Sequence, residues 1–85
     1  MGTNSRIAGP WTEAIAAEIR AERARQKLSQ VALAEASGVP RSTLVKLEAG
    51  SRPIDMEQLR LIADALGISQ WELVQRAEAN SAGLS

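Results

Sequence analysis

Cysteine and histidine are both absent from the 85-residue chain. Without cysteine, the chain can form neither a disulfide nor a thiolate metal site. Without histidine, it lacks the usual zinc ligand and the side chain that most often acts as a general base. No pair of carboxylates comes with a nucleophile, a metal ligand or a phosphate-binding loop. We therefore expect a protein that is not an enzyme, has no catalytic residues and needs neither a metal nor another cofactor.

Long apolar runs are also absent. No stretch approaches the roughly 20 apolar residues that a membrane-spanning helix needs. The first ten residues, MGTNSRIAGP, have neither the basic start nor the apolar centre of a secretory signal. We expect a cytoplasmic protein with no membrane partner, either associated with the nucleoid or in a host cytoplasm. The length corresponds to one domain and leaves no room for a second, ligand-sensing domain.

The net charge of zero hides an uneven distribution of charge along the chain. Residues 1–52 contain eight cationic and five anionic side chains, a net charge of +3. Residues 53–85 contain two cationic and five anionic side chains, a net charge of −3. Such a chain is suited to an oriented contact with a charged partner, although twenty charges also divide in this way by chance.

The remaining pattern is helical. Alanine, leucine, glutamate and arginine dominate, and no segment alternates β-branched with polar residues, so no strand is expected. Five helices are predicted, over about residues 12–26, 29–38, 40–49, 55–67 and 69–78. Helices this short, joined by short loops, favour a compact all-α fold. We expect a folded domain at residues 11–78, a flexible N-terminal arm at 1–10 and a flexible tail at 79–85.

Capping residues mark most of the predicted helix boundaries. Four segments open with a side chain that can cap a helix N-terminus: Thr12, Ser29, Asp55 and Ser69. The last two are followed three residues later by Gln58 and Glu72, which is the pattern of a capping box. Three segments are followed by a glycine that can take the left-handed conformation of a helix C-terminus: Gly38, Gly50 and Gly67.

The segment from 28 to 50, LSQVALAEASGVPRSTLVKLEAG, predicts two short helices around a turn at Gly38. The second helix divides into two faces on a wheel of about 100° per residue. The outward face carries Arg41, Ser42, Val45, Lys46 and Ala49, and the opposite face carries Thr43, Leu44, Leu47 and Glu48. Two helices crossing at a glycine-containing turn form a helix-turn-helix unit, whose second helix enters the major groove of DNA.

The chain resembles the lambda-repressor-like, or Xre/Cro, helix-turn-helix domains over about residues 15–78. The matching residues are Gln30, Ala34, Gly38, Val39, Ser42, Leu44, Leu47, Glu48 and Gly50, followed by Leu59, Ala63, Leu66, Gly67 and the run SQWEL. Three positions depart from the family pattern. Lys27 stands where the family often has glycine, Pro40 replaces the usual serine or threonine cap, and Glu22 stands where many members have an apolar residue.

The resemblance implies a compact five-helix domain, a double-stranded DNA partner and a role for individual side chains. The base-contacting residues it implies are Arg41, Ser42, Val45 and Lys46. The phosphate-contacting residues are Ser29, Gln30, Thr43, Ser51 and Arg52. Arg23 and Glu48 correspond to a structural ion pair. These roles agree with the chemistry, because arginine can bond guanine bidentately and valine can contact a thymine methyl.

Residues outside these sets receive structural interpretations. Arg20, Arg25 and Lys27 are expected to form a solvated face. Trp11 and Trp71 are expected in the core or in an interface rather than stacked on bases.

Three functions remain open at this point. The first is a sequence-specific transcriptional repressor, similar to phage repressors and Cro proteins, that binds a palindromic operator as a homodimer. The second is an antitoxin that sequesters a toxin and represses its own operon, and a toxin or an antirepressor is thus a possible protein partner. The third is a protein-interaction module whose third helix contacts protein. Salt-sensitive DNA binding would separate the first two from the third.

Overall fold

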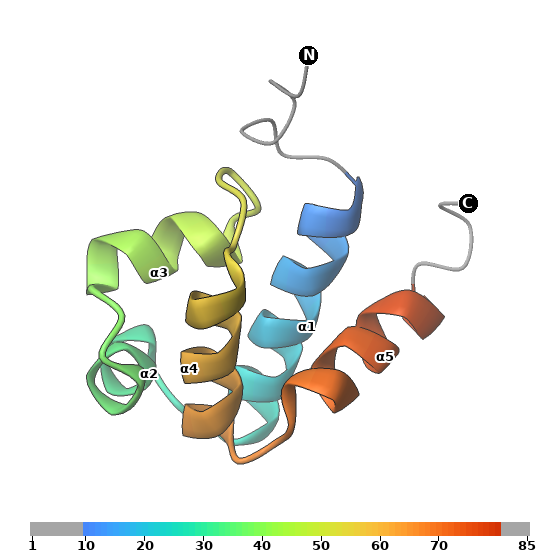
Figure 1. Ribbon diagram of the computed structural model, residues 1–85. Coiled ribbons are helices and arrows are strands. Elements are labelled where there is room, and N and C mark those ends of the chain that lie inside the picture. The colour runs from blue at the N-terminus through green and yellow to red at the C-terminus, as the bar shows by residue number, and fades with distance from the viewer. Residues whose placement is uncertain (1–9, 81–85) are drawn as a thin grey trace.

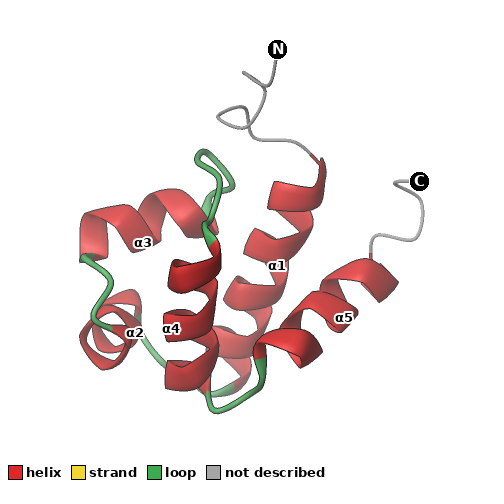
Figure 2. Ribbon diagram, in the orientation of Figure 1, coloured by secondary structure: helices red, strands yellow, loops and turns green. Residues whose placement is uncertain are grey.

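The computed structural model describes residues 10–80, so nearly all of the expected N-terminal arm and the end of the expected tail lie outside the described residues. The described part consists of five α-helices: α1 (Pro10–Arg25), α2 (Gln30–Ser37), α3 (Arg41–Glu48), α4 (Met56–Leu66) and α5 (Gln70–Asn80). No strand occurs between residues 10 and 80 (Figure 2). The predicted all-α class with five helices is confirmed.

The helices form two groups that meet at α4. Figure 1 shows α2 and α3 on one side, joined by a short turn, with α1 and α5 on the other. Helix α1 packs against α5, and α4 packs against α2, α5 and α1. Helix α3 contacts α2 and α1 and lies at the edge of the fold, so that one of its faces is left uncovered. This arrangement presents a short helix on a support built from the other four.

Isoleucine and leucine side chains from all five helices form the core. Its largest members are Ile15, Ile19, Leu33, Leu44, Leu47, Leu59, Ile62, Leu66 and Leu73. Helix α3 contributes Leu44 and Leu47, both almost completely buried. Burial of one such side chain stabilises a fold by about 1.5–3 kcal/mol. These two leucines therefore fasten α3 by its inner face, as the helical wheel predicts.

The predicted helix caps in the central part of the chain are confirmed. The Ser29 hydroxyl accepts a hydrogen bond from the Ala32 amide at 3.0 Å and caps α2. Asp55 and Gln58 form both bonds of a capping box at the start of α4. Gly38 ends α2 with a φ of 79°, a conformation that costs a residue without a side chain very little.

The start of α1 differs from the prediction. The helix begins at Pro10, so Thr12 lies in its first turn and is not the N-cap. Proline is well suited to the first turn because its φ is already near the helical value and it has no amide hydrogen to leave unpaired. Pro10, which precedes the predicted start at Thr12, thus opens the helix.

Both ends of α5 also differ from the prediction. The Ser69 hydroxyl accepts a hydrogen bond from the Glu72 amide at 2.9 Å, but the second bond of the capping box, from the Ser69 amide to the Glu72 carboxylate, does not form. That carboxylate instead accepts a hydrogen bond from Arg76 at 2.6 Å. At its other end, α5 runs beyond Glu78 to Asn80, whose amide donates to Glu18 on α1. A tertiary contact extends a helix that its own sequence would let fray.

The turn that closes α1 has Lys27, and not a glycine, at its left-handed position. Lys27 has a φ of 58°, a left-handed conformation that costs a residue with a Cβ about 1–2 kcal/mol. Its amide donates to the Ala24 carbonyl and the Leu28 amide donates to the Arg23 carbonyl, both at 3.0 Å. Helix α1 is therefore closed by the usual left-handed residue, but that residue is a lysine, whose Cβ makes this conformation unfavourable.

Candidate nucleic-acid interface

Helix α3 has one exposed face and one buried face. Arg41, Ser42, Val45 and Lys46, the four residues predicted to contact bases, are all exposed on the same face. Thr43 is half-buried, and Leu44, Leu47 and Glu48 are buried. The burial pattern matches the two arcs of the helical wheel. The structure therefore brings the four predicted base-contacting residues together on a surface that the rest of the fold leaves open.

The cations of this surface have no partner among residues 10–80. Arginines elsewhere in the described chain make hydrogen bonds or ion pairs: Arg20, Arg23, Arg25, Arg60 and Arg76. By contrast, four side chains make no hydrogen bond or ion pair within this range: Arg41, Lys46, Arg52 and Lys27. Three of these four cations lie on α3 or directly after it. They keep their full capacity to bond an anionic or polar ligand.

The N-terminus of α3 carries no side-chain cap. Its N-cap is Pro40, which makes no capping hydrogen bond. The first amides of a helix have no acceptor within the helix, and an external anion such as a phosphate can fill that role. Arg41 follows immediately and is exposed. The end of α3 that carries Arg41 is thus its electropositive end.

The start of α2 holds two of the residues predicted to contact phosphate. Ser29 is exposed, and its hydroxyl already accepts the capping bond from Ala32. Gln30 is half-buried, and its side-chain amide donates to the Glu48 carboxylate on α3 at 3.1 Å. This link between α2 and α3 was not predicted. Gln30 therefore has a structural contact in addition to its proposed DNA contact.

Glu48 is the buried anchor behind α3. Its side chain is 2% exposed, and its two carboxylate oxygens accept hydrogen bonds from Arg23 Nε at 2.8 Å and Nη2 at 3.0 Å. The third nitrogen of Arg23 donates to the Leu28 carbonyl at 2.8 Å. Paired bonds between arginine and a carboxylate fix both distance and orientation. The structure thus joins the two residues of the predicted structural ion pair, and ties α3 to α1.

Arg20 also holds α3, although it was predicted to be a solvated residue. It donates from Nη1 to the backbone carbonyl of Glu48, and its Nη2 lies 3.5 Å from the Glu13 carboxylate. Arg25 is exposed, as predicted, and also donates to Glu22 at 2.8 Å and 3.1 Å. Both side chains remain largely exposed. The partner of Arg20 lies 28 residues away in the sequence, and no local pattern indicates it.

The loop after α3 turns at Gly50, which has a φ of 71°. The Ser51 amide and hydroxyl both donate to the Lys46 carbonyl, at 3.1 Å and 3.2 Å. Ser51 and Arg52 are both exposed. The Ser51 hydroxyl thus helps close the end of α3, while the Arg52 side chain extends beside it without a bond to residues 10–80.

Within residues 10–80, no helix has the length and apolarity required to span a membrane.

The fold and the geometry of α3 define a class of protein. Helix α2, the glycine turn and α3 form a helix-turn-helix unit. The buried face of α3 packs against the fold and its exposed face carries unpaired cations, which is the arrangement of a unit that binds DNA. A sequence model of the helix-turn-helix family matches residues 19–69, and the chain belongs to this family. Its five-helix fold is the lambda-repressor-like one, which confirms the resemblance drawn from the sequence.

Solved structures of regulators share the fold. The clp gene regulator ClgR from Corynebacterium glutamicum is 33% identical, with 85% of this chain and 77% of that chain covered and a TM-score of 0.80. The restriction-modification controller protein C.AhdI from Aeromonas hydrophila is 32% identical, with 73% and 94% covered and a TM-score of 0.70. The wild-type controller C.Esp1396I, at 22% identity and a TM-score of 0.73 over 82% and 95%, shares the fold alone.

A search of curated proteins gave no match. Family membership and similarity to solved regulators nevertheless agree with the geometry of α3. The protein is a DNA-binding transcriptional regulator of the helix-turn-helix family.

Proposed function

We propose that the protein is a sequence-specific repressor that binds a palindromic operator as a homodimer, with α3 in the major groove. The observation that carries this proposal is the exposed face of α3. It holds the unpaired cations Arg41 and Lys46 beside Ser42 and Val45, above an inner face that is fully buried. The similar proteins named as a gene regulator and as controllers support a regulatory role for this chain.

Each side chain of this face has a partner in the major groove. Arg41, at the end of α3 that enters the groove, is suited to bidentate bonds with guanine O6 and N7. Lys46 can bond the same atoms less rigidly, Ser42 can bond several bases, and Val45 can contact a thymine methyl. Each good bidentate contact contributes about 1–3 kcal/mol of discrimination against the wrong base.

The phosphate contacts would come from both ends of the unit. Ser29 and Gln30 lie at the start of α2, Thr43 is on the flank of α3, and Ser51 and Arg52 follow α3. Such contacts fix orientation and do not read sequence. Because they replace counterions on the DNA, binding should weaken as salt rises.

A homodimer is proposed because one α3 reads only a few base pairs, which is too little against a genome of competing sites. The candidate interface, called the pairing surface below, consists of Trp11, Ile54, Met56, Trp71 and Val74. These residues line a hollow of about 520 Å³ together with Ile15 and Leu59. None belongs to α3.

The exposure of the pairing surface supports its proposed role. Trp11 is 47% exposed, Trp71 65% and Met56 72%. Neither tryptophan is a core residue, and this exposure supports the interface as the proposed location of both. Tryptophan and methionine are enriched in interfaces, and a two-fold dimer would place the same surface of both copies together. Its two α3 helices would then lie about 34 Å apart, one turn of DNA.

Selection of bound sites from random DNA tests the proposal. We expect a palindrome whose half-sites are separated by about one helical turn. The selected site and a duplex carrying one half-site are then titrated at two salt concentrations. Tighter binding to the full site, with two chains per duplex, supports the homodimer. Equal affinity for the selected site and scrambled DNA would contradict sequence-specific binding.

A further inference from the structure

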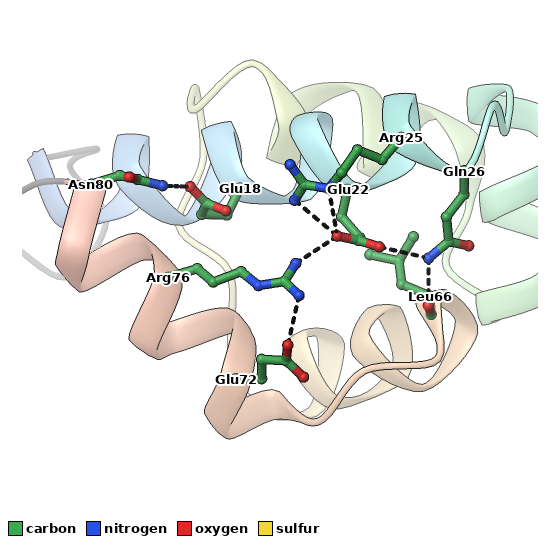
Figure 3. A network of polar contacts seen from close by, with 8 residues as sticks. All are labelled: Glu18, Glu22, Arg25, Gln26, Leu66, Glu72, Arg76 and Asn80. Atoms are coloured by element: carbon green, nitrogen blue, oxygen red, sulfur yellow. Dashed lines mark hydrogen bonds and ion pairs between the residues drawn. The ribbon is translucent and has the colours of Figure 1, made fainter.

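A second group of polar contacts lies away from α3, between α1 and α5. Its centre is Glu22, which is 8% exposed (Figure 3). Glu22 Oε1 accepts hydrogen bonds from Arg76 Nη1 at 2.5 Å and from Arg25 Nη2 at 2.8 Å, and Oε2 accepts one from Gln26 at 2.9 Å. Gln26 also donates to the Leu66 carbonyl at 2.6 Å, which brings the end of α4 into the group. The carboxylate therefore collects donors from two helices.

Helix α5 is joined to α1 by two of these polar links. Arg76 donates to Glu22, and one turn later Asn80 donates to Glu18, one turn earlier on α1. Figure 3 shows both side chains reaching from α5 towards α1. The two links follow the antiparallel course of the helices. Together they fix the position of α5 along α1 as well as its distance from it.

The apolar contact of α5 leaves its position weakly determined. Its buried residues are Leu73 and Ala77, one of which is very small. Dispersion contacts have little directionality, whereas hydrogen bonds lose strength steeply when their angle changes. Arg76 is held from both sides, because a second nitrogen donates to Glu72 at 2.6 Å. The polar links therefore add directional contacts to the apolar packing of α5.

The opposite flank of α5 carries part of the pairing surface. On a wheel of about 100° per residue, Leu73 and Ala77 lie between a polar flank and an apolar flank. Arg76 and Asn80 lie on the polar flank, and Trp71 and Val74 lie on the other. A movement of α5 relative to α1 would displace these two side chains from Trp11. The contacts of Arg76 and Asn80 thus influence the shape of the pairing surface, although neither residue belongs to it.

We propose that Arg76 and Glu22 are positioning residues for dimerisation. Their contact fixes α5 in the direction that aligns Trp71 and Val74 with Trp11, and thereby sets how two copies pair on DNA. This inference rests on the proposed homodimer. It assigns a function to a glutamate that stands where related domains usually have an apolar residue, and buried polar groups are known to specify one packing arrangement in some proteins.

Arg25 provides a matched control for Arg76. Both arginines donate to the same oxygen of Glu22, but Arg25 lies on α1 itself and does not join it to α5. The substitutions Arg76→Met and Arg25→Met each remove one positive charge; the first removes one hydrogen bond to Glu22 and the second removes two. The measured quantity is the ratio of affinities for the full operator and the isolated half-site. Affinity for the half-site serves as a check of α3 in each variant.

We expect Arg76→Met to lower this ratio about tenfold with half-site affinity unchanged, since substitutions that modulate coupling have effects of this order. Arg25→Met should leave the ratio unchanged. Asn80→Ala, at an exposed position, should lower the ratio by a smaller factor, and it tests the same contact line if Arg76→Met fails to fold. Arg76→Lys, which keeps one bond, should recover part of the loss.

An unchanged ratio in Arg76→Met and Asn80→Ala would overturn the positioning role. So would an equal loss in Arg25→Met, because the effect would then follow Glu22 stability alone. A wild-type protein that binds full sites and half-sites equally would overturn the homodimer itself, and this inference with it. The wild-type titration therefore separates failure of the proposed function from failure of the positioning role.

Discussion

Glu48 and Glu22 are buried glutamates that both accept hydrogen bonds from arginine, yet they secure opposite parts of the molecule. Glu48 lies on α3 and receives Arg23 from α1 and Gln30 from α2. Glu22 lies on α1 and receives Arg76 from α5. The first carboxylate holds the helix proposed to face DNA, and the second holds the helix proposed to face another copy. One kind of contact thus serves two surfaces with separate functions.

The two carboxylates differ in what their loss would leave behind. Without Glu48, Arg23 would keep only the Leu28 carbonyl as a partner. Without Glu22, Arg76 would keep Glu72, and Arg25 is exposed enough to turn to water. A buried charge that loses its partner is costly, while a charge that can reach water or another partner is not. The contact behind α3 should therefore be the more important of the two for stability.

Substitution of Glu48 should have the largest effect. Glu48→Ala is expected to lower the free energy of unfolding by roughly 3–5 kcal/mol, because it removes the buried partner of Arg23, whose side chain is only 21% exposed. Chemical denaturation measures the loss, with Glu35→Ala, at an exposed position of α2, as the control. Equal stability of Glu48→Ala and the parent would show that Glu48 does not anchor α3.

The Glu22 group should show a distinct dependence on pH. Hydrogen bonds from Gln26 and Arg25, with a contribution from Arg76, lower the pKa of Glu22 from 4.5 to about 2, against the opposing effect of burial. A depressed pKa in the folded state stabilises the fold above the ordinary value, and this stabilisation is lost as pH falls towards the lowered one. The difference between the two pKa values corresponds to a contribution of roughly 3 kcal/mol to the free energy of unfolding.

Glu22→Gln isolates this contribution. The substitution should lower stability at pH 7, and the gap between the variant and the parent should close as pH falls from 4.5 to about 2. Denaturation series at several pH values measure the gap. A gap that stays constant across this range would show that the charge of Glu22 does not stabilise the fold.

A substitution on the outward face of α3 should change recognition of DNA bases without changing the stability of the fold. Arg41→Ala is expected to cost about 1–3 kcal/mol of operator affinity and to relax preference at one base pair in each half-site. Thermal stability should not change, because Arg41 makes no bond to residues 10–80. Arg60→Ala removes the same charge from α4 and controls for general electrostatics. An unchanged ratio of affinities for operator and scrambled DNA would exclude Arg41 as a base-reading residue.

The smallest effect is expected for a substitution at the end of α1 that involves neither Glu48 nor Glu22. Lys27→Gly should raise stability by about 0.5–1 kcal/mol, since relief of the left-handed strain exceeds the entropy that glycine loses on folding. The melting temperature measures the gain. The variant would offer a more stable background for the Glu48 and Glu22 substitutions. A lower melting temperature would show that Lys27 makes a contribution that outweighs its strain.

The sequence was most informative where a feature depends on neighbouring residues. Ser29, Gly38 and the Asp55 box act over three or four residues, so their patterns indicate them directly. The two faces of α3 follow from helical periodicity. The assignment of Arg23 to Glu48, 25 residues away, came only from the family resemblance.

Contacts between distant segments were missed. Arg76 and Glu22 are separated by 54 residues, and Asn80 and Glu18 by 62. Periodicity shows that Arg76 lies beside the buried stripe of α5, but it does not show which helix lies opposite. The one available signal was a glutamate at a position that is usually apolar. Its partners became evident only when α5 was placed against α1.

The division of α3 into an anchored face and an unbonded face also affects how this protein can change over time. Glu48, Leu44 and Leu47 hold the helix, whereas the side chains of Arg41 and Lys46 make no bond within residues 10–80. Mutations at the outward positions therefore carry little folding penalty, and if α3 reads DNA as proposed, a duplicated gene could acquire a new operator by a few such changes. The same separation makes α3 a practical site for engineering altered DNA specificity, with the remaining four helices left as they are.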